Sequence, residues 1–568
     1  MVDKVPQTRN RGHVMSDSEP LVAPEAPVPE GVPESAPEVV PVVPEKVTSA
    51  PALPQPALEI AAGYSFTGPA LELGTLLWEG QCHAEAQVRI PLSMLNRHGL
   101  VAGATGTGKT KTLQLIAEQL SANGVPVFLA DVKGDVSGIS APGEANDKVA
   151  QRSGEVGQEW QGTGFPCEFY GLGGIGPGIP LRATVTSFGP VLLSKVLQLN
   201  QTQEQSLGLI FHYADAKGLE LYDLKDLRAV VAFLVSDTGK GELKGIGGLS
   251  SVTAGVILRA ITAFEQQGAG DFFGEPEFDT SELMRLAPDG RGLVSVLELP
   301  AVQDKPQLFS TFLMWLLADL YGDLPEVGDM DRPKLVFFFD EAHLLFKGAS
   351  KAFLESITQT VRLIRSKGVG IFFVTQTPKD VPADVLAQLG NRVQHALRAF
   401  TPDDAKALKA TVKTFPNSPY DLEELLTGLG TGEAVITVLS EKGAPTPVAA
   451  TRLRAPESLM GPIDAAALDQ AVKSSLLYGR YAEAVDRESA YEKLTAEQQA
   501  AEAAALQAAD EAAAAKEAAK APVRQKQDAS LAGQVVGSGM FSSLARSLGT
   551  QIGREISRSI FGTAKRRR

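Results

Sequence analysis

The sequence predicts an α/β protein built on a mainly parallel β-sheet. Short apolar segments alternate with helical segments along the middle of the chain. One apolar segment runs into a glycine-rich turn that opens a helix, which is the start of a βαβ unit. Continuous apolar runs such as Leu335–Phe339 indicate strands covered on both faces, as in a parallel sheet.

The first βαβ unit is the best defined part of the pattern. We expect a strand at Gly99–Ala102, a helix at Lys111–Leu120 with apolar residues at steps of three and four, and a second strand at Val125–Ala130. A short β-like segment, Tyr64–Leu92, precedes this unit.

The later elements complete the sheet. Residues 137–178 are rich in Gly, Ser and Pro and are expected to form a loop, and about 188–290 are expected to form a helical insertion. Further strands are expected at Gly292–Leu299, Lys334–Phe339, Gly370–Thr375, His395–Ala399 and Gly432–Leu439, with a helix at Ser350–Lys367.

Composition divides the chain into four parts. Residues 1–57 form a Pro/Glu-rich tail that is expected to be disordered, and residues 58–480 form the core domain. An Ala/Glu-rich helical spacer covers 481–522. The basic tail, 523–568, carries an apolar helical stripe and ends in four cations, Lys565–Arg568. A packed C-terminal helix, a membrane-surface or partner contact, and a DNA contact all fit this tail.

Bulk properties exclude several classes of protein. Two cysteines are too few for a disulfide scaffold or a cysteine-rich zinc module. There is no secretory signal and no apolar run near the roughly 18 residues of a membrane span, so we expect a cytoplasmic protein. The net charge of −14 argues against a generic basic nucleic-acid coat, although a locally basic channel remains compatible with it.

The glycine-rich turn matches the phosphate-binding pattern GxxxxGK[ST], the P-loop or Walker A motif. Its backbone amides and the helix N-terminus bind phosphate oxygens, the lysine contacts the β- and γ-phosphates, and the threonine hydroxyl is a Mg²⁺ ligand. The expected nucleotide-binding residues are Gly103, Ala104, Thr105, Gly106, Thr107, Gly108, Lys109, Thr110 and Lys111.

A second strand supplies the carboxylates that such a site requires. Leu335–Phe339 is followed by Asp340 and Glu341, the Walker B arrangement. Asp340 is the expected Mg²⁺ ligand, and Glu341 is the expected general base that polarises the attacking water. The alternative is a buried strand that ends in a solvated acidic pair. An Asp-Glu pair with a P-loop favours continuous hydrolysis of ATP.

Other polar residues are weaker candidates. Gln376 ends a third strand and could sense the γ-phosphate or position water, or be a plain loop residue. In a ring, an arginine of a neighbouring subunit would stabilise the transition state. Arg365 is the first choice and Arg362 the second, ahead of Arg392 and Arg398; the alternative for each is a surface arginine.

Charged residues after the second strand complete the set of candidates. Asp131, Lys133 and Asp135 either contact nucleotide or Mg²⁺ or form a turn of alternating charge. His343 either contacts the site or is simply packed beside it. No His/Cys cluster has the spacing of metal ligands.

Four segments resemble one protein family, the HerA-like ATPases, which are related to the FtsK DNA translocases. The segments are Leu95–Thr110, Asp131–Asp135, Phe338–His343 and Gly368–Gln376. The chain looks most similar to the bacterial YjgR-like branch of this family. The resemblance implies a RecA-like P-loop core that uses ATP and Mg²⁺ and assembles as a hexamer around double-stranded DNA. It also implies a nuclease partner, although the segment before the core is short for the family's N-terminal barrel.

Two function hypotheses follow from these observations. The first is a ring ATPase that translocates or remodels double-stranded DNA. The second is an ATPase that remodels or signals to protein, or acts at the membrane surface, without nucleic acid; the overall acidity favours this one. A scaffold with a merely structural nucleotide conflicts with the presence of Lys109, Thr110, Asp340 and Glu341 together.

Overall fold

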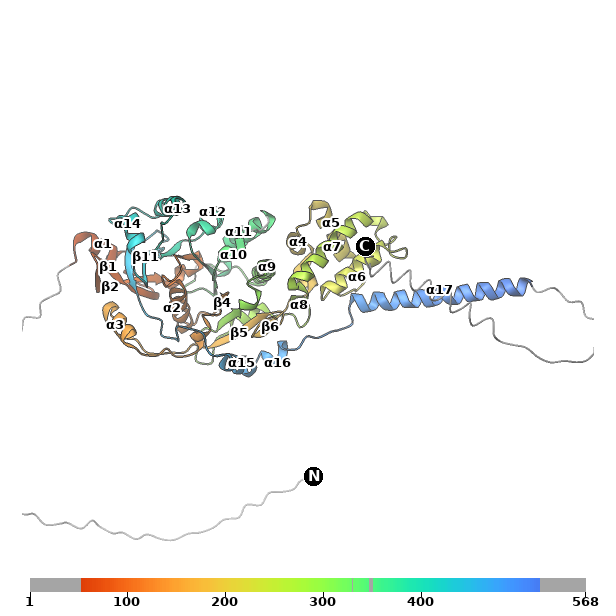
Figure 1. Ribbon diagram of the computed structural model, residues 1–568, viewed down its shortest axis with the longest axis horizontal. Helices are drawn as coiled ribbons and strands as arrows, with labels where there is room; N and C mark the ends of the chain where they lie inside the picture. The colour runs from red at the N-terminus through yellow and green to blue at the C-terminus, as the bar shows by residue number, and fades with distance from the viewer. Residues whose placement is uncertain (1–52, 329, 347–350, 521–568) are drawn as a thin grey trace, which may run out of the picture. The chain divides into compact units, whose positions relative to one another are not determined.

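The computed structural model describes residues 53–328, 330–346 and 351–520, and within them the chain forms one twelve-stranded sheet (Figure 1). Eight adjacent strands run parallel to one another. In spatial order they are β10 (Asn391–Gln394), β3 (Gly99–Ala102), β9 (Val369–Thr375), β8 (Leu335–Phe339), β4 (Val127–Asp131), β7 (Val294–Glu298), β5 (Cys167–Leu172) and β6 (Ile179–Leu181). This arrangement confirms the predicted, mainly parallel α/β sheet.

Four antiparallel strands extend the sheet beyond β10. In order from the edge they are β2 (Gln81–Pro91), β1 (Ala70–Trp78), β12 (Ala449–Leu453) and β11 (Glu433–Thr437). The β-like segment predicted before the P-loop is therefore a hairpin, β1–β2. It joins the sheet through β12, a strand that the sequence analysis did not identify.

The central strands are buried at every position, which is why they appear in the sequence as unbroken apolar runs. Successive side chains of a strand point to opposite faces, so both faces of the sheet are covered. Aromatic side chains fill much of this core; for example, the rings of Phe338 and Phe372 stack with centroids 5.2 Å apart.

Two expectations were wrong. The segment His395–Ala399 is not a strand, because β10 ends at Gln394 and the chain then turns to bury His395 and Ala396 next to the P-loop. Residues 137–178 are not all loop. They include α3 (Asp147–Val156), capped by the Asn146 side chain, and β5, which pairs with β7.

The helical insertion lies between β6 and β7. It comprises α4 (Val185–Val196), α5 (Gln201–Ala216), α6 (Leu224–Val235), α7 (Ser251–Phe264) and α8 (Gly270–Phe272). Reciprocal capping boxes at Asn200 and Asp223 fix the starts of α5 and α6. Apolar residues at helical spacing, such as Leu227, Val230 and Ile257, form its buried interior.

The remaining helices cover the sheet or follow it. They are α1 (Gln55–Ala62), α2 (Lys109–Ala122), α9 (Pro306–Asp323), α10 (His343–Phe346), α11 (Lys351–Ile364), α12 (Ala383–Leu386), α13 (Pro402–Val412), α14 (Leu422–Gly428), α15 (Ala465–Ser474), α16 (Tyr478–Tyr481) and α17 (Ala490–Lys520). Because α1 begins at Gln55 and buries Ala57, ordered structure starts slightly earlier than predicted.

The segment after the sheet, residues 454–493, crosses the core and then reaches the insertion. On α2, Glu118 accepts hydrogen bonds from the amides of Glu457 and Ser458 (2.9 and 3.1 Å). At its far end, Tyr491 donates its amide hydrogen to Asp226 of α6 (3.1 Å). We call residues 454–493 the strap.

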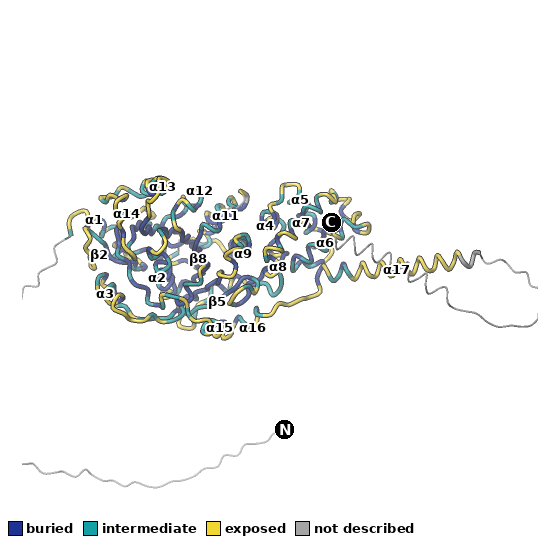
Figure 2. The backbone as a smooth tube through the Cα atoms, in the orientation of Figure 1, coloured by how far each residue is buried: buried dark blue, intermediate teal, exposed yellow. Residues whose placement is uncertain are grey.

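Helix α17 leaves the insertion after its first turns. Leu494 is buried, whereas residues 496–516 are exposed, as the yellow helix in Figure 2 shows. This is the exposed Ala-rich helix expected from composition. In the described part of the chain no helix is both long and apolar enough to cross a bilayer. The basic tail, 523–568, and residues 1–52 lie outside the described residues.

Candidate active site

The P-loop connects β3 directly to α2, as predicted. Gly106 and Gly108 have φ of 78° and 109°, conformations that side chains with a Cβ rarely adopt. Gly108 is the N-cap residue of α2, so Lys109 and Thr110 form the first turn of that helix. These two positions therefore require glycine because of their backbone conformation, and not only because a side chain would lack room.

The inner face of the loop offers free backbone donors. Among the described residues, the amides of Thr105, Gly106 and Gly108 have no protein acceptor. The Lys109 ammonium donates to the Ala104 carbonyl oxygen (3.1 Å) across the loop. Burial lowers the pKa of Lys109. Unpaired amides around a helix N-terminus and a lysine make an anion site.

Neighbouring strands hold the loop from outside. The amides of Gly103 and Ala104 donate to the carbonyl oxygens of Thr375 (3.2 Å) and Ala396 (2.8 Å). The Gly432 amide donates to the Thr107 carbonyl oxygen (3.0 Å). These bonds satisfy the outward backbone groups of the loop, so its remaining amides face the phosphate position.

His395 is a residue near the site that the sequence analysis misplaced in a strand. Its imidazole is fully buried, with Nε2 2.9 Å from the Thr112 hydroxyl of α2. Burial lowers the pKa of His395 to about 4, so the ring is neutral at physiological pH. Through this contact with α2, His395 stabilises the position of the P-loop. Its position immediately after β10, the strand beside the P-loop strand, is the signal that could have revealed it.

The Walker B carboxylates lie across one strand from the P-loop. Strand β9 separates β3 from β8, and the charges of Glu341 and Asp340 act on the Lys109 ammonium, opposing the effect of burial on its pKa. Both carboxylates are buried, and each has an oxygen with no hydrogen-bond partner among the described residues, Asp340 Oδ2 and Glu341 Oε2. Glu341 also has a positive φ of 47°, which is strained for a non-glycine residue.

These residues fit a magnesium ion and a nucleotide. Asp340 offers an unsatisfied buried carboxylate oxygen, and the Thr110 hydroxyl has no protein partner in the described part of the chain. Hard oxygen ligands of this kind, few in number, are what Mg²⁺ uses when it binds together with phosphates.

The two carboxylates differ in their electrostatics. Burial raises the pKa of Asp340 to about 6, against the opposing charge of Lys133. Burial alone would also raise the pKa of Glu341, but the hydrogen bond from Lys133 and the charges around it lower that pKa overall. Glu341 is therefore ionised at neutral pH, as a general base must be.

For the charged residues after β4, the sequence left open a structural turn or a contact with the nucleotide site. The structure shows a turn shaped by Asp131 and a contact of Lys133 with the Walker B carboxylates. The Asp131 carboxylate accepts hydrogen bonds from the amides of Lys133 (3.1 Å), Gly134 (2.7 Å) and Val136 (2.8 Å), so it shapes the turn. The Lys133 ammonium instead contacts Glu341 Oε1 and lies 3.9 Å from Asp340 Oδ2. Sequence reasoning gave Lys133 no definite role, because this contact joins two distant segments.

Two predicted residues lie at the carboxyl edge of the sheet, and in the described part of the chain neither forms a hydrogen bond with the P-loop. Gln376 follows β9, between the P-loop strand and the Walker B strand, and is exposed. His343 Nδ1 lies 3.1 Å from Glu341 Oε2. Lys111, by contrast, directs its ammonium to Gln114 Oε1 (3.2 Å), away from the loop.

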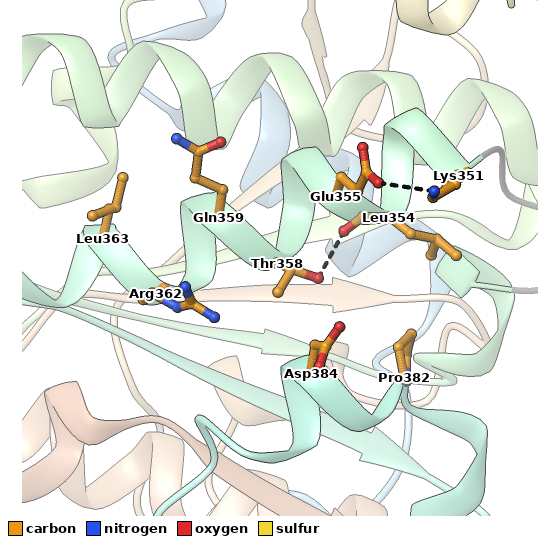
Figure 3. Close-up of a pocket in the computed structure, with 9 residues that line it drawn as sticks. All are labelled: Lys351, Leu354, Glu355, Thr358, Gln359, Arg362, Leu363, Pro382 and Asp384. Atoms are coloured by element: carbon orange, nitrogen blue, oxygen red, sulfur yellow. Dashed lines mark hydrogen bonds and ion pairs between the residues drawn. The ribbon is translucent and has the colours of Figure 1, made fainter.

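The candidate arginines Arg362 and Arg365 lie at the amino edge of the sheet, opposite the edge that carries the P-loop and the carboxylates. They sit at the end of α11, where the neighbouring Val361 carbonyl oxygen is 2.7 Å from Nε2 of His98, just before β3 begins. Both are exposed. Arg362 lines a hollow of about 570 Å³ between α11 and α12, across from Asp384 (Figure 3). Neither arginine therefore reaches the phosphate site of its own chain.

The other two arginines are also apart from the carboxylates. Arg392 donates to the Thr414 carbonyl oxygen (3.3 Å), and burial lowers its pKa. Arg398 is exposed in the segment after β10. Within the described residues, neither forms an ion pair with Asp340 or Glu341.

A P-loop at a helix N-terminus, facing an Asp-Glu pair across one strand, defines a P-loop ATPase, an enzyme class whose substrate is ATP complexed with Mg²⁺. Comparison with known proteins narrows this class. The family model "Helicase HerA-like C-terminal" matches residues 78–568. The chain belongs to the HerA-like helicase family, which confirms the resemblance seen in its motifs.

Individual relatives are distant. The DNA double-strand break repair helicase HerA of Sulfurisphaera tokodaii is 23% identical over 392 residues, covering 64% of this chain and 68% of that protein. HerA of Sulfolobus acidocaldarius is 21% identical over 363 residues, covering 62% and 64%. The chain thus spans about two thirds of each archaeal protein. Among solved structures, the bacterial conjugative coupling protein TrwB aligns with a TM-score of 0.46 at 15% identity, covering 71% of this chain and 94% of that one.

Proposed function

We propose that this ATPase is a motor that translocates or remodels double-stranded DNA as a ring of identical subunits, the hexamer implied by its family. The observation that carries the proposal is the P-loop facing Asp340 and Glu341 in a chain of the HerA-like helicase family. The archaeal relatives named above are DNA repair helicases, which supports DNA as the polymer. We place the protein in the cytoplasm.

Each site residue has a role in hydrolysis. The P-loop amides and Lys109 bind the β- and γ-phosphates and offset their charge. Thr110 and Asp340 would hold Mg²⁺, which supplies charge neutralisation at the phosphates. Glu341 accepts a proton from the attacking water, and Gln376 orients that water at the end of β9.

The position of Arg362 and Arg365 supports assembly. Because both lie at the amino edge of the sheet, neither can stabilise the transition state in its own chain. An arginine from a neighbouring subunit would complete the site, and Arg365 remains the first candidate. Assembly and hydrolysis should therefore depend on each other.

The decisive experiment measures ATP hydrolysis with duplex DNA, with RNA and without polymer at low salt, together with the mass of the assembly. The proposal predicts hydrolysis that duplex DNA stimulates and rising salt suppresses, since phosphate contacts dominate such binding. Lys109→Ala should remove hydrolysis under all conditions. A turnover that duplex DNA leaves unchanged at low salt would favour the alternative, an ATPase acting on protein, which the net charge of −14 favours.

A further inference from the structure

Lys133 is held in a defined place beside the Walker B carboxylates. Three backbone amides donate to Asp131 and fix the turn, and Gln303 Nε2 donates to the Val132 carbonyl oxygen (2.5 Å). From this turn the Lys133 side chain crosses from the end of β4 to the end of β8, the neighbouring strand.

Among the described residues, Lys133 is the lysine that forms ion pairs with these two carboxylates. Its ammonium contacts Glu341 Oε1 and lies 3.9 Å from Asp340 Oδ2. The P-loop lysine, Lys109, donates to the Ala104 carbonyl oxygen instead. On the other side of this carboxylate, His343 Nδ1 lies 3.1 Å from Glu341 Oε2.

This contact conflicts with the work of a general base. A carboxylate that removes a proton from water needs a free oxygen facing that water. In the structure, the Lys133 ammonium pairs with Glu341 Oε1 and leaves Oε2 as the oxygen without a hydrogen-bond partner among the described residues. A carboxylate paired with an ammonium is a weaker base, so opening the ion pair would strengthen Glu341 as a base and free its second oxygen. The lysine is the partner with room to move: its side chain is 41% exposed, whereas that of Glu341 is 9% exposed.

The terminal phosphate of ATP is the group that would draw the lysine away. Bound by the P-loop and Lys109, it would bring negative charge to the neighbourhood of the carboxylates, where the Lys133 ammonium lies. A lysine ammonium is a compact cation that binds phosphate oxygens well. ADP lacks this phosphate, so it offers Lys133 no new partner.

We propose that Lys133 holds Glu341 in the nucleotide-free protein and moves to the γ-phosphate when ATP binds, which frees the base. The proposal rests on the proposed ATPase function of this site. It makes Lys133 a sensor of the third phosphate, distinct from Lys109, which contacts nucleotide whether or not the γ-phosphate is present.

The test compares the affinities of the full chain for ADP and for a non-hydrolysable ATP analogue, both with Mg²⁺, by displacement of a fluorescent nucleotide. Lys133→Met should weaken binding of the analogue about tenfold and leave ADP binding within about twofold. Lys133→Arg keeps the charge and should recover most of the analogue affinity. Lys334→Met is the control for the loss of a lysine, because Lys334 is half-buried and directly precedes β8, at the opposite edge of the sheet from the carboxylates.

Each other outcome is informative. Equal losses for ADP and the analogue, or no loss for either, would overturn the role of Lys133. Retained ADP binding also shows that the Lys133→Met variant is folded. Lys109→Ala should lose both nucleotides; if it bound them normally, the proposed function of the site would fail independently of Lys133.

Discussion

Asp131 and Asp340 occupy similar places in neighbouring strands but have opposite surroundings. Asp131 ends β4, and both of its carboxylate oxygens accept backbone hydrogen bonds. Asp340 follows β8, and its Oδ2 atom is buried without a hydrogen-bond partner among the described residues. A carboxylate whose oxygens are satisfied by the protein shapes a turn, whereas one left unsatisfied is available to a ligand.

The comparison extends to the residues that follow. After β4, the chain makes a turn in which Asp131 is the acceptor and Lys133 points outward to the next strand. After β8, Glu341 adopts a strained left-handed conformation. Strain at one strand end and a relaxed, capped turn at the other indicate that the site is concentrated at β8. The experiments below test this difference and, last, the support of the P-loop.

The largest effect is expected at the base. Glu341→Gln removes the proposed proton acceptor but keeps the side-chain shape, so hydrolysis should fall about 100-fold or more while nucleotide binding persists. Steady-state turnover and nucleotide affinity, measured on the same preparation, give the two quantities. Glu326→Gln makes the same chemical change on the surface and should leave turnover unchanged. Substantial hydrolysis by Glu341→Gln would remove Glu341 from its assigned role.

The two aspartates should affect stability with opposite signs. Asp131→Asn leaves the Val136 amide without its acceptor. We expect this loss to outweigh the relief of the burial that raises the pKa of Asp131, so the variant should lower the free energy of unfolding by about 1–3 kcal/mol. Asp340→Asn removes a poorly compensated buried charge and should raise it by about 1–3 kcal/mol at pH 8, without nucleotide or metal.

The pH dependence checks the cause of the second effect. Burial raises the pKa of Asp340 from its ordinary value of 3.8 to about 6, so the folded state binds the proton more tightly than the unfolded state. The destabilising contribution of Asp340 is therefore absent below about pH 4 and complete above about pH 6. The advantage of Asp340→Asn in thermal melts should vanish at low pH. An equal shift in melting temperature at low pH and at pH 8 would exclude this explanation.

The smallest effect is expected at the contact between Thr112 and His395, which stabilises the position of the P-loop. Thr112→Val removes the hydroxyl that faces His395 and should weaken nucleotide binding about three- to tenfold, without abolishing hydrolysis. His395→Ala should weaken it similarly, and the double variant should be no worse than the His395 variant if the bond between them matters. Additive losses would show that the two residues act separately.

Local patterns explain which parts were predictable. The P-loop and the strand before Asp340 combine a fixed spacing of residue types with apolar runs, and both are found where predicted. The wrong strand at His395–Ala399 and the unpredicted strand β12 depend on partners far along the chain. An apolar run such as Ala396–Leu397 has the same appearance whether it pairs in a sheet or packs in a buried turn.

The site shows the same limit. Lys109, Asp340 and Glu341 are identified by motif, but the contact of Lys133 with Glu341 and the support of the P-loop by His395 join segments that are distant in sequence. Charge and residue type suggested that Lys133 was relevant without indicating its partner. The partner of Lys133 depends on which strands are neighbours in the sheet, and the sequence around Lys133 does not determine this.

The strap gives the nucleotide-binding helix a direct mechanical link to the insertion. Near its start it is tied to α2 through Glu118, and at its far end it is tied to α6 through Asp226. Between these anchors the strap contains α15 and α16 and is held to the core, for example by Arg182, which donates to the Tyr481 carbonyl oxygen (2.9 Å). A shift of α2 on binding or releasing nucleotide would displace the start of the strap, and these contacts define the path along which that displacement would reach the insertion.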